Sequence, residues 1–105
     1  MSAVTWPGVE IRLLVALKSV ADAGSFSRAA RELGYTQSAV SGQITALERA
    51  VGARLIDRVR GARHVELTRE GGILLGHAEA ITARLAAARA DLESLRGAPH
   101  LRSAG

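Results

Sequence analysis

Apolar residues recur every three or four positions along most of this chain, which is the spacing of helices with one buried face. The first such stretch runs from Pro7 to about Ala23 and predicts a helix that ends at Gly24. Proline suits the first turn of a helix, because its missing N–H has no partner to lose there. The predicted buried stripe of this helix consists of Ile11, Leu14, Leu17, Val20 and Ala21.

Two short helices joined by a turn are predicted between Ser25 and Glu48. Ser25 or Ser27 can cap the first, Gly34 can take the left-handed conformation that ends it, and Thr36 can cap the second. The second helix has an apolar face of Val40, Ile44 and Leu47 and a polar face of Gln37, Ser38, Ser41, Gly42, Thr45 and Glu48. This is the outline of a helix-turn-helix that presents its second helix outward.

Weak alternation of apolar and polar residues replaces the helical spacing after Gly52. Residues 55–58 and 64–67 are predicted to form two strands of a hairpin, with residues 59–63 at its tip.

The last stretch carries a regular heptad pattern on a helix predicted over residues 69–96, with Thr68 as its cap. The apolar stripe that this pattern forms is narrow and needs a second helix to bury it, so we expect two copies of the chain to pair through it. The alternative is that the helix folds back on its own domain. The heptad residues are Leu74, Ala78, Ile81, Leu85, Ala88, Leu92 and Leu95.

A length of 105 residues allows one domain with an appended helix. We expect a domain over residues 7–68, the pairing helix over 69–96 and a flexible tail over 97–105. Because aromatic residues make up 3% of the chain, Val, Leu, Ile and Ala must fill its core.

The charge is basic and unevenly placed, with 14 Lys plus Arg against 10 Asp plus Glu, and Lys18 is the one lysine. Five arginines and a single acid, Asp57, lie between positions 49 and 63. Guanidinium groups suit phosphates and guanine edges, so a basic stretch next to a helix-turn-helix indicates nucleic acid as a partner. A merely solvated face is the simpler alternative.

No catalytic or metal-binding pattern is present in the sequence. The chain has no cysteine, and His64, His77 and His100 lie on three different predicted elements. Ser41 has no base placed to activate it, and no glycine-rich phosphate loop is found. We therefore expect no enzyme activity, no cofactor and no metal. Charged residues interrupt the apolar run from Val9 to Val20, so neither a membrane span nor a signal peptide is predicted and a cytoplasmic protein is expected.

A long series of residues resembles the amino-terminal domain of LysR-type bacterial transcriptional regulators over residues 11–96. These residues are Gly24 to Ser27, Ala29-Ala30, Leu33, Gln37 to Ser41, Gln43-Ile44, Leu47-Glu48, Gly52, Leu55, Arg58, Leu67-Thr68 and Gly71. The resemblance implies a mainly α fold: a winged helix-turn-helix of three helices and a two-stranded wing, followed by a long linker helix through which a homodimer forms. The winged domain of another regulator type, such as the molybdate-responsive one, is a second possibility that the motif from Gln37 to Ser41 disfavours.

The resemblance also implies binding to double-stranded DNA, with the second motif helix in the major groove and the wing in the minor groove. The DNA-binding residues, around a motif from Phe26 to Thr45, are then Ser27, Arg28, Arg31, Thr36, Gln37, Ser38, Ser41, Gly42, Gln43, Thr45, Arg49, Arg54, Arg58, Arg60 and Arg63. Many members of the family carry arginine where this chain has Gly42.

A dimer of this kind is expected to recognise an interrupted palindrome in DNA. The protein is therefore expected to be associated with the nucleoid. A small-molecule effector would act only through a further carboxy-terminal domain, which this sequence lacks. The alternative from a different class is a helical protein-interaction module without specific DNA binding.

Overall fold

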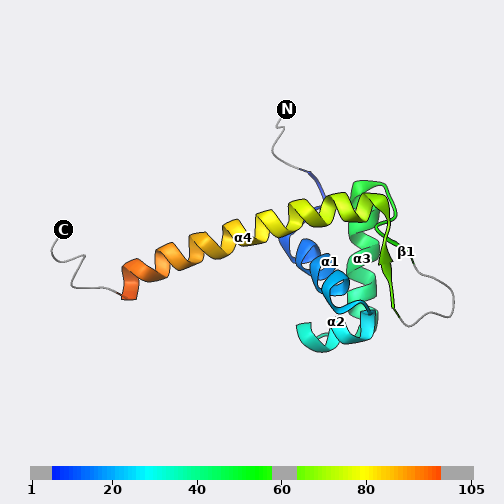
Figure 1. Cartoon of the computed structure of the whole chain (residues 1–105), viewed down its shortest axis with the longest axis horizontal. Helices are drawn as coiled ribbons and strands as arrows, with labels where there is room; N and C mark the ends of the chain where they lie inside the picture. Colours follow the sequence, from blue (N-terminus) through cyan, green and yellow to red (C-terminus); the bar gives the residue numbers. More distant parts are fainter. Residues whose placement is uncertain (1–5, 58–63, 98–105) are drawn as a thin grey trace.

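The computed structural model describes residues 6–57 and 64–97, which form four helices and one small antiparallel sheet. The elements are α1 (Ile11–Ala23), α2 (Phe26–Leu33), α3 (Gln37–Val51), β1 (Ile56–Asp57), β2 (Glu66–Leu67) and α4 (Arg69–Gly97). Figure 1 shows α1, α2, α3 and the sheet gathered at one end of α4, whose remaining length extends away from them. This is a winged helix-turn-helix followed by a long helix, as predicted.

Helix α1 begins at Ile11, so the prediction that it starts at Pro7 was wrong. Pro7 and Gly8 form a turn instead, and Gly8 has a φ of 84°, which no right-handed helix contains. A Cβ at Gly8 would lie 2.9 Å from the Cβ of Ala50, so this glycine also lets the chain pass close to α3. Ile11, predicted to be buried, is 43% exposed at the first position of the helix.

The caps predicted for the helix-turn-helix are confirmed. The Oγ of Ser25 accepts a hydrogen bond from the N–H of Arg28 at 3.1 Å, and the Oγ1 of Thr36 accepts one from Ala39 at 3.0 Å. Ser25, rather than Ser27, is therefore the cap of α2. Gly34 ends that helix in the left-handed conformation that was predicted for it.

One apolar core holds the helices and the sheet together. Its residues come from α1, α2, α3, β1, the residue before β1 and the first turns of α4, and each is at most 4% exposed. They are Leu13, Leu14, Ala16, Leu17, Val20, Ala29, Ala30, Val40, Ile44, Leu47, Leu55, Ile56 and Ala78. Among the described residues, no polar or charged side chain is buried with them. Ala21 of the predicted stripe is half-buried, while Leu13 and Ala16 join the core without having been predicted.

The sheet pairs Ile56 with Leu67 and Asp57 with Glu66, so the predicted hairpin is present as the wing. Its strands are shorter than predicted, because residues 55, 64 and 65 are not part of them. Two backbone hydrogen bonds fix its base: Val65 donates to the carbonyl of Gly24 at 2.9 Å, and Thr68 donates to that of Leu55 at 2.9 Å. The predicted tip, residues 59–63, lies outside the described residues, as does Arg58.

Helix α4 is continuous over 29 residues, about 43 Å at 1.5 Å per residue. Thr68 caps it as predicted, since its Oγ1 accepts from the N–H of Gly71 at 3.0 Å. A Cβ at Gly71 would collide with the carbonyl oxygen of Leu55, so glycine is what allows the first turn of α4 to lie on the strand segment.

The heptad pattern of α4 is divided between two environments. Ala78 is fully buried in the chain's own core, so the prediction that it contacts a partner was wrong, while Leu74 is partly buried against the same core. Beyond them Ile81, Leu85, Leu92 and Leu95 are 39%, 49%, 56% and 57% exposed, and Ala88 is exposed as well. The fold-back alternative therefore holds for the first turns of α4 and fails for the rest. Within the described residues, no helix has the length and apolar character that crossing a membrane requires.

Candidate nucleic-acid interface

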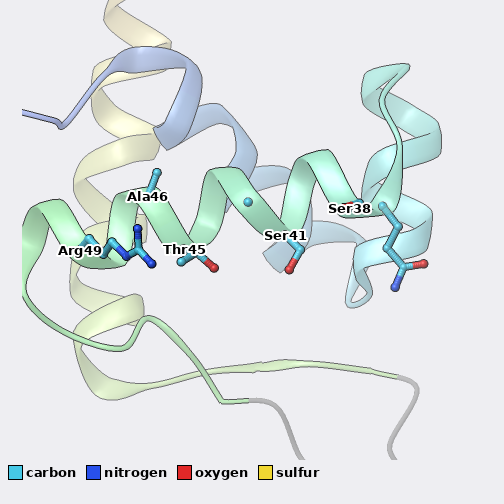
Figure 2. Close-up of a pocket in the computed structure, with 7 residues that line it drawn as sticks. Ser38, Ser41, Thr45, Ala46 and Arg49 are labelled. Atoms are coloured by element: carbon cyan, nitrogen blue, oxygen red, sulfur yellow. The ribbon is translucent and has the colours of Figure 1, made fainter.

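The outward side of α3 forms a shallow, open groove. Because Val40, Ile44 and Leu47 are fully buried on the inner side, the helix must turn its polar residues outward. Figure 2 shows Ser41 and Thr45 projecting from the same side of α3, with Arg49 further along the helix. The residues that line the groove are Gln37, Ser38, Ser41, Gly42, Thr45, Ala46 and Arg49.

Arg49 is the one charged residue of the described chain that lines this groove, and its other polar side chains are uncharged hydrogen-bonding groups. An amide and three hydroxyl groups can donate and accept hydrogen bonds, which is how side chains read base edges in a major groove. Among the described residues, no atom other than those of α3 next to Gly42 lies within 4 Å of the position where its Cβ would stand, so the backbone of α3 is open to close approach there. Six of the predicted DNA-binding residues meet in this one groove: Gln37, Ser38, Ser41, Gly42, Thr45 and Arg49.

Gln43, one of the predicted DNA-binding residues, is absent from the groove. It precedes Leu47 by four residues, so both side chains lie on the same flank of α3. The side chain is half-buried, and its Oε1 is buried without a hydrogen-bond partner among the described residues. The Oε1 of Gln43 is therefore not available to a base in this conformation.

Glu48 was predicted on the polar outer face, and that prediction was wrong. Its side chain is 13% exposed, and its Oε2 accepts hydrogen bonds from the backbone N–H groups of Leu55 at 2.8 Å and Ile56 at 3.3 Å. These two donors precede and open strand β1, so the carboxylate ties the end of α3 to the base of the wing.

Arg54 is directed toward the same place. Its Nε lies 3.9 Å from the Oε2 of Glu48, and its Nη2 donates to the carbonyl of Ile56 at 3.5 Å. It lines neither the groove on α3 nor the cleft described next. Thr36 is exposed, but its hydroxyl is engaged as the cap of α3. Three further predicted residues, Arg58, Arg60 and Arg63, lie outside the described residues.

A polar cleft adjoins the groove at the amino-terminal end of α3. It brings together three more predicted residues, Ser27, Arg28 and Arg31, and shares Gln37 with the groove. It also contains His64, which is not among the predicted DNA-binding residues. The residues that line this α2–wing cleft are Ala23, Gly24, Ser25, Ser27, Arg28, Arg31, Gln37 and His64.

The ion pair of Lys18 and Asp22 lies away from these surfaces. The pKa of Lys18 on α1 is raised because its ammonium donates a hydrogen bond to Asp22 at 2.9 Å, and neither residue lines the groove or the cleft. Within the described part of the chain, no three His, Asp or Glu side chains gather as a metal site would require.

Comparison with known proteins agrees with this geometry. Residues 11–72 match the family model of the bacterial regulatory helix-turn-helix proteins of the lysR family. The HTH-type transcriptional regulator CbbR of Rhodospirillum rubrum is 41% identical over 87 residues, which cover 83% of this chain and 28% of that protein. An uncharacterised HTH-type transcriptional regulator of Azotobacter vinelandii is 42% identical over 89 residues, covering 85% of this chain and 60% of that protein. The chain thus spans less than two thirds of the length of either relative.

Solved structures give the same result. The CbnR DNA-binding domain in complex with DNA is 32% identical with a TM-score of 0.71, and the match covers 85% of this chain and 99% of that one. The BenM DNA-binding domain bound to catB site 1 DNA is 28% identical with a TM-score of 0.77, over 84% of this chain and 96% of that one. The chain therefore belongs to the lysR family of bacterial regulatory helix-turn-helix proteins and forms the DNA-binding domain of such a regulator.

Proposed function

We propose that this chain binds duplex DNA in a sequence-specific manner as part of a LysR-type transcriptional regulator, with α3 in the major groove and the wing in the adjacent minor groove. The observation that carries this proposal is the groove on α3, where uncharged donors and acceptors form one continuous outward surface from Gln37 to Thr45. Such groups discriminate between base pairs, whereas they contribute little to the overall attraction to DNA.

Affinity must come from the arginines beside this surface. Arg28 and Arg31 lie in the α2–wing cleft at one end of the groove, and Arg49 lines its other end. Each guanidinium that neutralises a phosphate releases counterions and makes binding weaker as the salt concentration rises. Arg63, with Arg60 as the alternative, is proposed to enter the minor groove from the wing tip.

Homodimerisation through α4 completes the proposed binding unit. The exposed heptad residues Ile81, Leu85, Ala88, Leu92 and Leu95 are a narrow apolar surface that a second α4 can cover. Two copies related by a two-fold axis would recognise an interrupted palindrome. Any response to a small molecule belongs to a separate effector domain of the whole regulator. The regulator is proposed to act in the cytoplasm, bound to the bacterial nucleoid.

Selection of bound sites from random duplex DNA tests the proposal, because one experiment reports binding, sequence preference and palindromy together. Gln37→Ala should then relax the preference at one position of each half-site, at a cost of about 1–3 kcal/mol on the selected sequence and little on random DNA. Gln43→Ala is the matched control, since it removes the same side chain from the same helix outside the groove. Equal losses on both DNAs for Gln37→Ala would assign that residue to a phosphate instead.

A helical protein-interaction module is the competing function, and the exposed heptad residues are the observation that favours it. It predicts no salt-dependent binding to duplex DNA, whereas the proposed function requires it.

A further inference from the structure

The α2–wing cleft has a basic chemistry that the groove on α3 lacks. Arg28, Arg31 and His64 line it together with the hydroxyl groups of Ser25 and Ser27, and no carboxylate lines it. In the described part of the chain, neither Arg28 nor Arg31 has an acidic side chain within 4.0 Å. Two arginines that pair with no described acidic side chain, next to a histidine, favour an anionic ligand.

The wing reaches this cleft through a fixed backbone contact. The N–H of Val65 donates to the carbonyl of Gly24 at 2.9 Å, and this hydrogen bond holds the neighbouring His64 beside the corner between α1 and α2. In Figure 1, α2 and the start of the wing's second strand lie at the same end of the domain. The position of His64 is therefore set by the fold.

The cleft is continuous with the surface proposed to read DNA bases. Gln37 lines both, so a duplex that places its major groove on Gln37, Ser41 and Thr45 carries one of its strands past the cleft. Phosphates stand at the edges of the major groove, which is about 12 Å wide. A phosphate at that edge is the anion that the position and the charge of the cleft both fit.

We propose that His64 is a DNA-contacting residue, which completes with Arg28 and Arg31 a site for one backbone phosphate at the base of the wing. This inference rests on the proposed function and adds to it a contact that comes from the start of the wing rather than from its tip. The protonated imidazole supplies a third positive charge and a hydrogen-bond donor to the phosphate oxygen.

The contact makes DNA binding depend on pH, because histidine is the side chain that changes its charge between about pH 5 and pH 8. The charged groups near His64 in the described residues are Arg28 and Arg31 of α2 and Glu66 of β2, whose Oε2 lies 3.9 Å from the Nε2 of His64. Both members of that pair are about two thirds exposed, so water screens their attraction and leaves His64 open to a phosphate.

The test measures the affinity of the chain for a selected duplex and for a random duplex of equal length, from about 50 to 200 mM salt at pH 6 and at pH 8. Four proteins are compared: the unaltered chain, His64→Gln, His64→Arg and, as the control, His77→Gln. His77 is an exposed histidine of α4 that borders an apolar pocket with Trp6 and Ile73, away from the cleft.

The unaltered chain should bind both duplexes more tightly at pH 6 than at pH 8. Its affinity should also fall more steeply with salt at pH 6, by about 0.9 in the slope of log affinity against log salt concentration per half-site. Over a fourfold rise in salt this slope corresponds to about 3.5-fold more affinity lost. His64→Gln should lose this difference between the two pH values. His64→Arg should show the steep slope at both, and His77→Gln should behave as the unaltered chain does. A structural role for His64 would not move the salt slope with pH.

The inference is overturned if His64→Gln keeps the pH-dependent slope, or if His64→Arg has the shallow slope at both pH values. Because the unaltered chain is tested on two duplexes, this failure is distinct from failure of the proposed function. Binding without preference for the selected duplex, or no binding at all, contradicts the proposed function itself.

Discussion

The winged domain and the distal part of α4 use the same apolar residues at the same helical spacing, with opposite results. Leu17 and Leu47 of the domain are fully buried, whereas Leu85, Leu92 and Leu95 of α4 are about half exposed. In the domain, each apolar stripe meets stripes from other elements of the same chain. Beyond Ala78, α4 extends away from the domain, and although Ile11 of α1 lies beside Ile81 and Leu85, these two side chains stay 39% and 49% exposed. Regular spacing of apolar residues thus identifies a helix surface that will be buried, whereas the fold decides whether the segment that buries it belongs to the same chain.

The division within α4 has a visible cause. Its first turn lies on the backbone of Leu55, because Gly71 has no side chain to separate them, and Ala78 is then carried into the core. The helix is long, so after it has passed Ile11 of α1, which lies beside Ile81 and Leu85, the rest of it extends beyond the small domain. From Ile81 onward every heptad residue is at least partly open to solvent.

The largest expected effect is on the exposed part of α4. Leu85→Glu would bury a carboxylate on each side of a two-fold interface and should destabilise the proposed dimer by about 3–5 kcal/mol or more. Sedimentation at micromolar concentration should show a monomer. Ala87→Glu, on the opposite side of the helix and exposed, is the control and should remain dimeric. A dimer of Leu85→Glu would show that α4 does not provide the interface.

The second prediction compares the two regions directly, in the Leu85→Glu background. Leu17→Ala should lower the free energy of unfolding by about 2–5 kcal/mol, because Leu17 is fully buried. Leu92→Ala should change it by less than about 0.5 kcal/mol. Denaturant unfolding followed by circular dichroism gives both values. Similar losses would mean that the distal helix belongs to the cooperative core after all.

The third prediction concerns the junction between the two regions. Gly71→Ala should destabilise the domain by about 1–3 kcal/mol, because its methyl group would collide with the carbonyl of Leu55. The methyl group of Gly72→Ala meets no other part of the described chain within 4 Å, so this change should stabilise α4 by up to about 1 kcal/mol. Melting temperatures of the pair, shifted in opposite directions, would confirm the close approach; equal shifts would contradict it.

The smallest effect is expected at the link between α3 and the wing. Glu48→Gln keeps an oxygen that can accept from Leu55 and Ile56 but removes the charge, so a loss of about 1 kcal/mol is expected. Unfolding experiments measure this loss. Asp22→Asn, which removes an acid from the exposed pair with Lys18, is the control and should have a smaller effect. A loss no greater than that of the control would show that the charge of Glu48 does not hold the wing.

Much of the fold was predictable because its signals are local. The cap of α3 joins residues three positions apart, Thr36 and Ala39, and Gly34 ends α2 by its own backbone conformation. The two sides of α3 follow from the helical repeat alone, which is why six of the predicted DNA-binding residues meet in the groove. The start of α1 was predicted wrongly because the preference of proline for the first turn of a helix depends only on nearby residues. The conformation of Gly8 depends instead on its close approach to Ala50, which lies on another helix.

The sequence by itself therefore determined the order of the elements, their caps and the polar side of α3, since each depends on residues within about one turn of each other. The tertiary structure alone decided that Glu48 turns inward to Leu55, that Gly71 lies against that same residue, and that Ala78 belongs to the core. It also decided that His64 stands beside Arg28 and Arg31. In each of these cases the contacting residue lies on another element. The spacing of residues in the sequence indicates on which side of a helix a side chain lies, but it does not indicate which residue that side chain contacts.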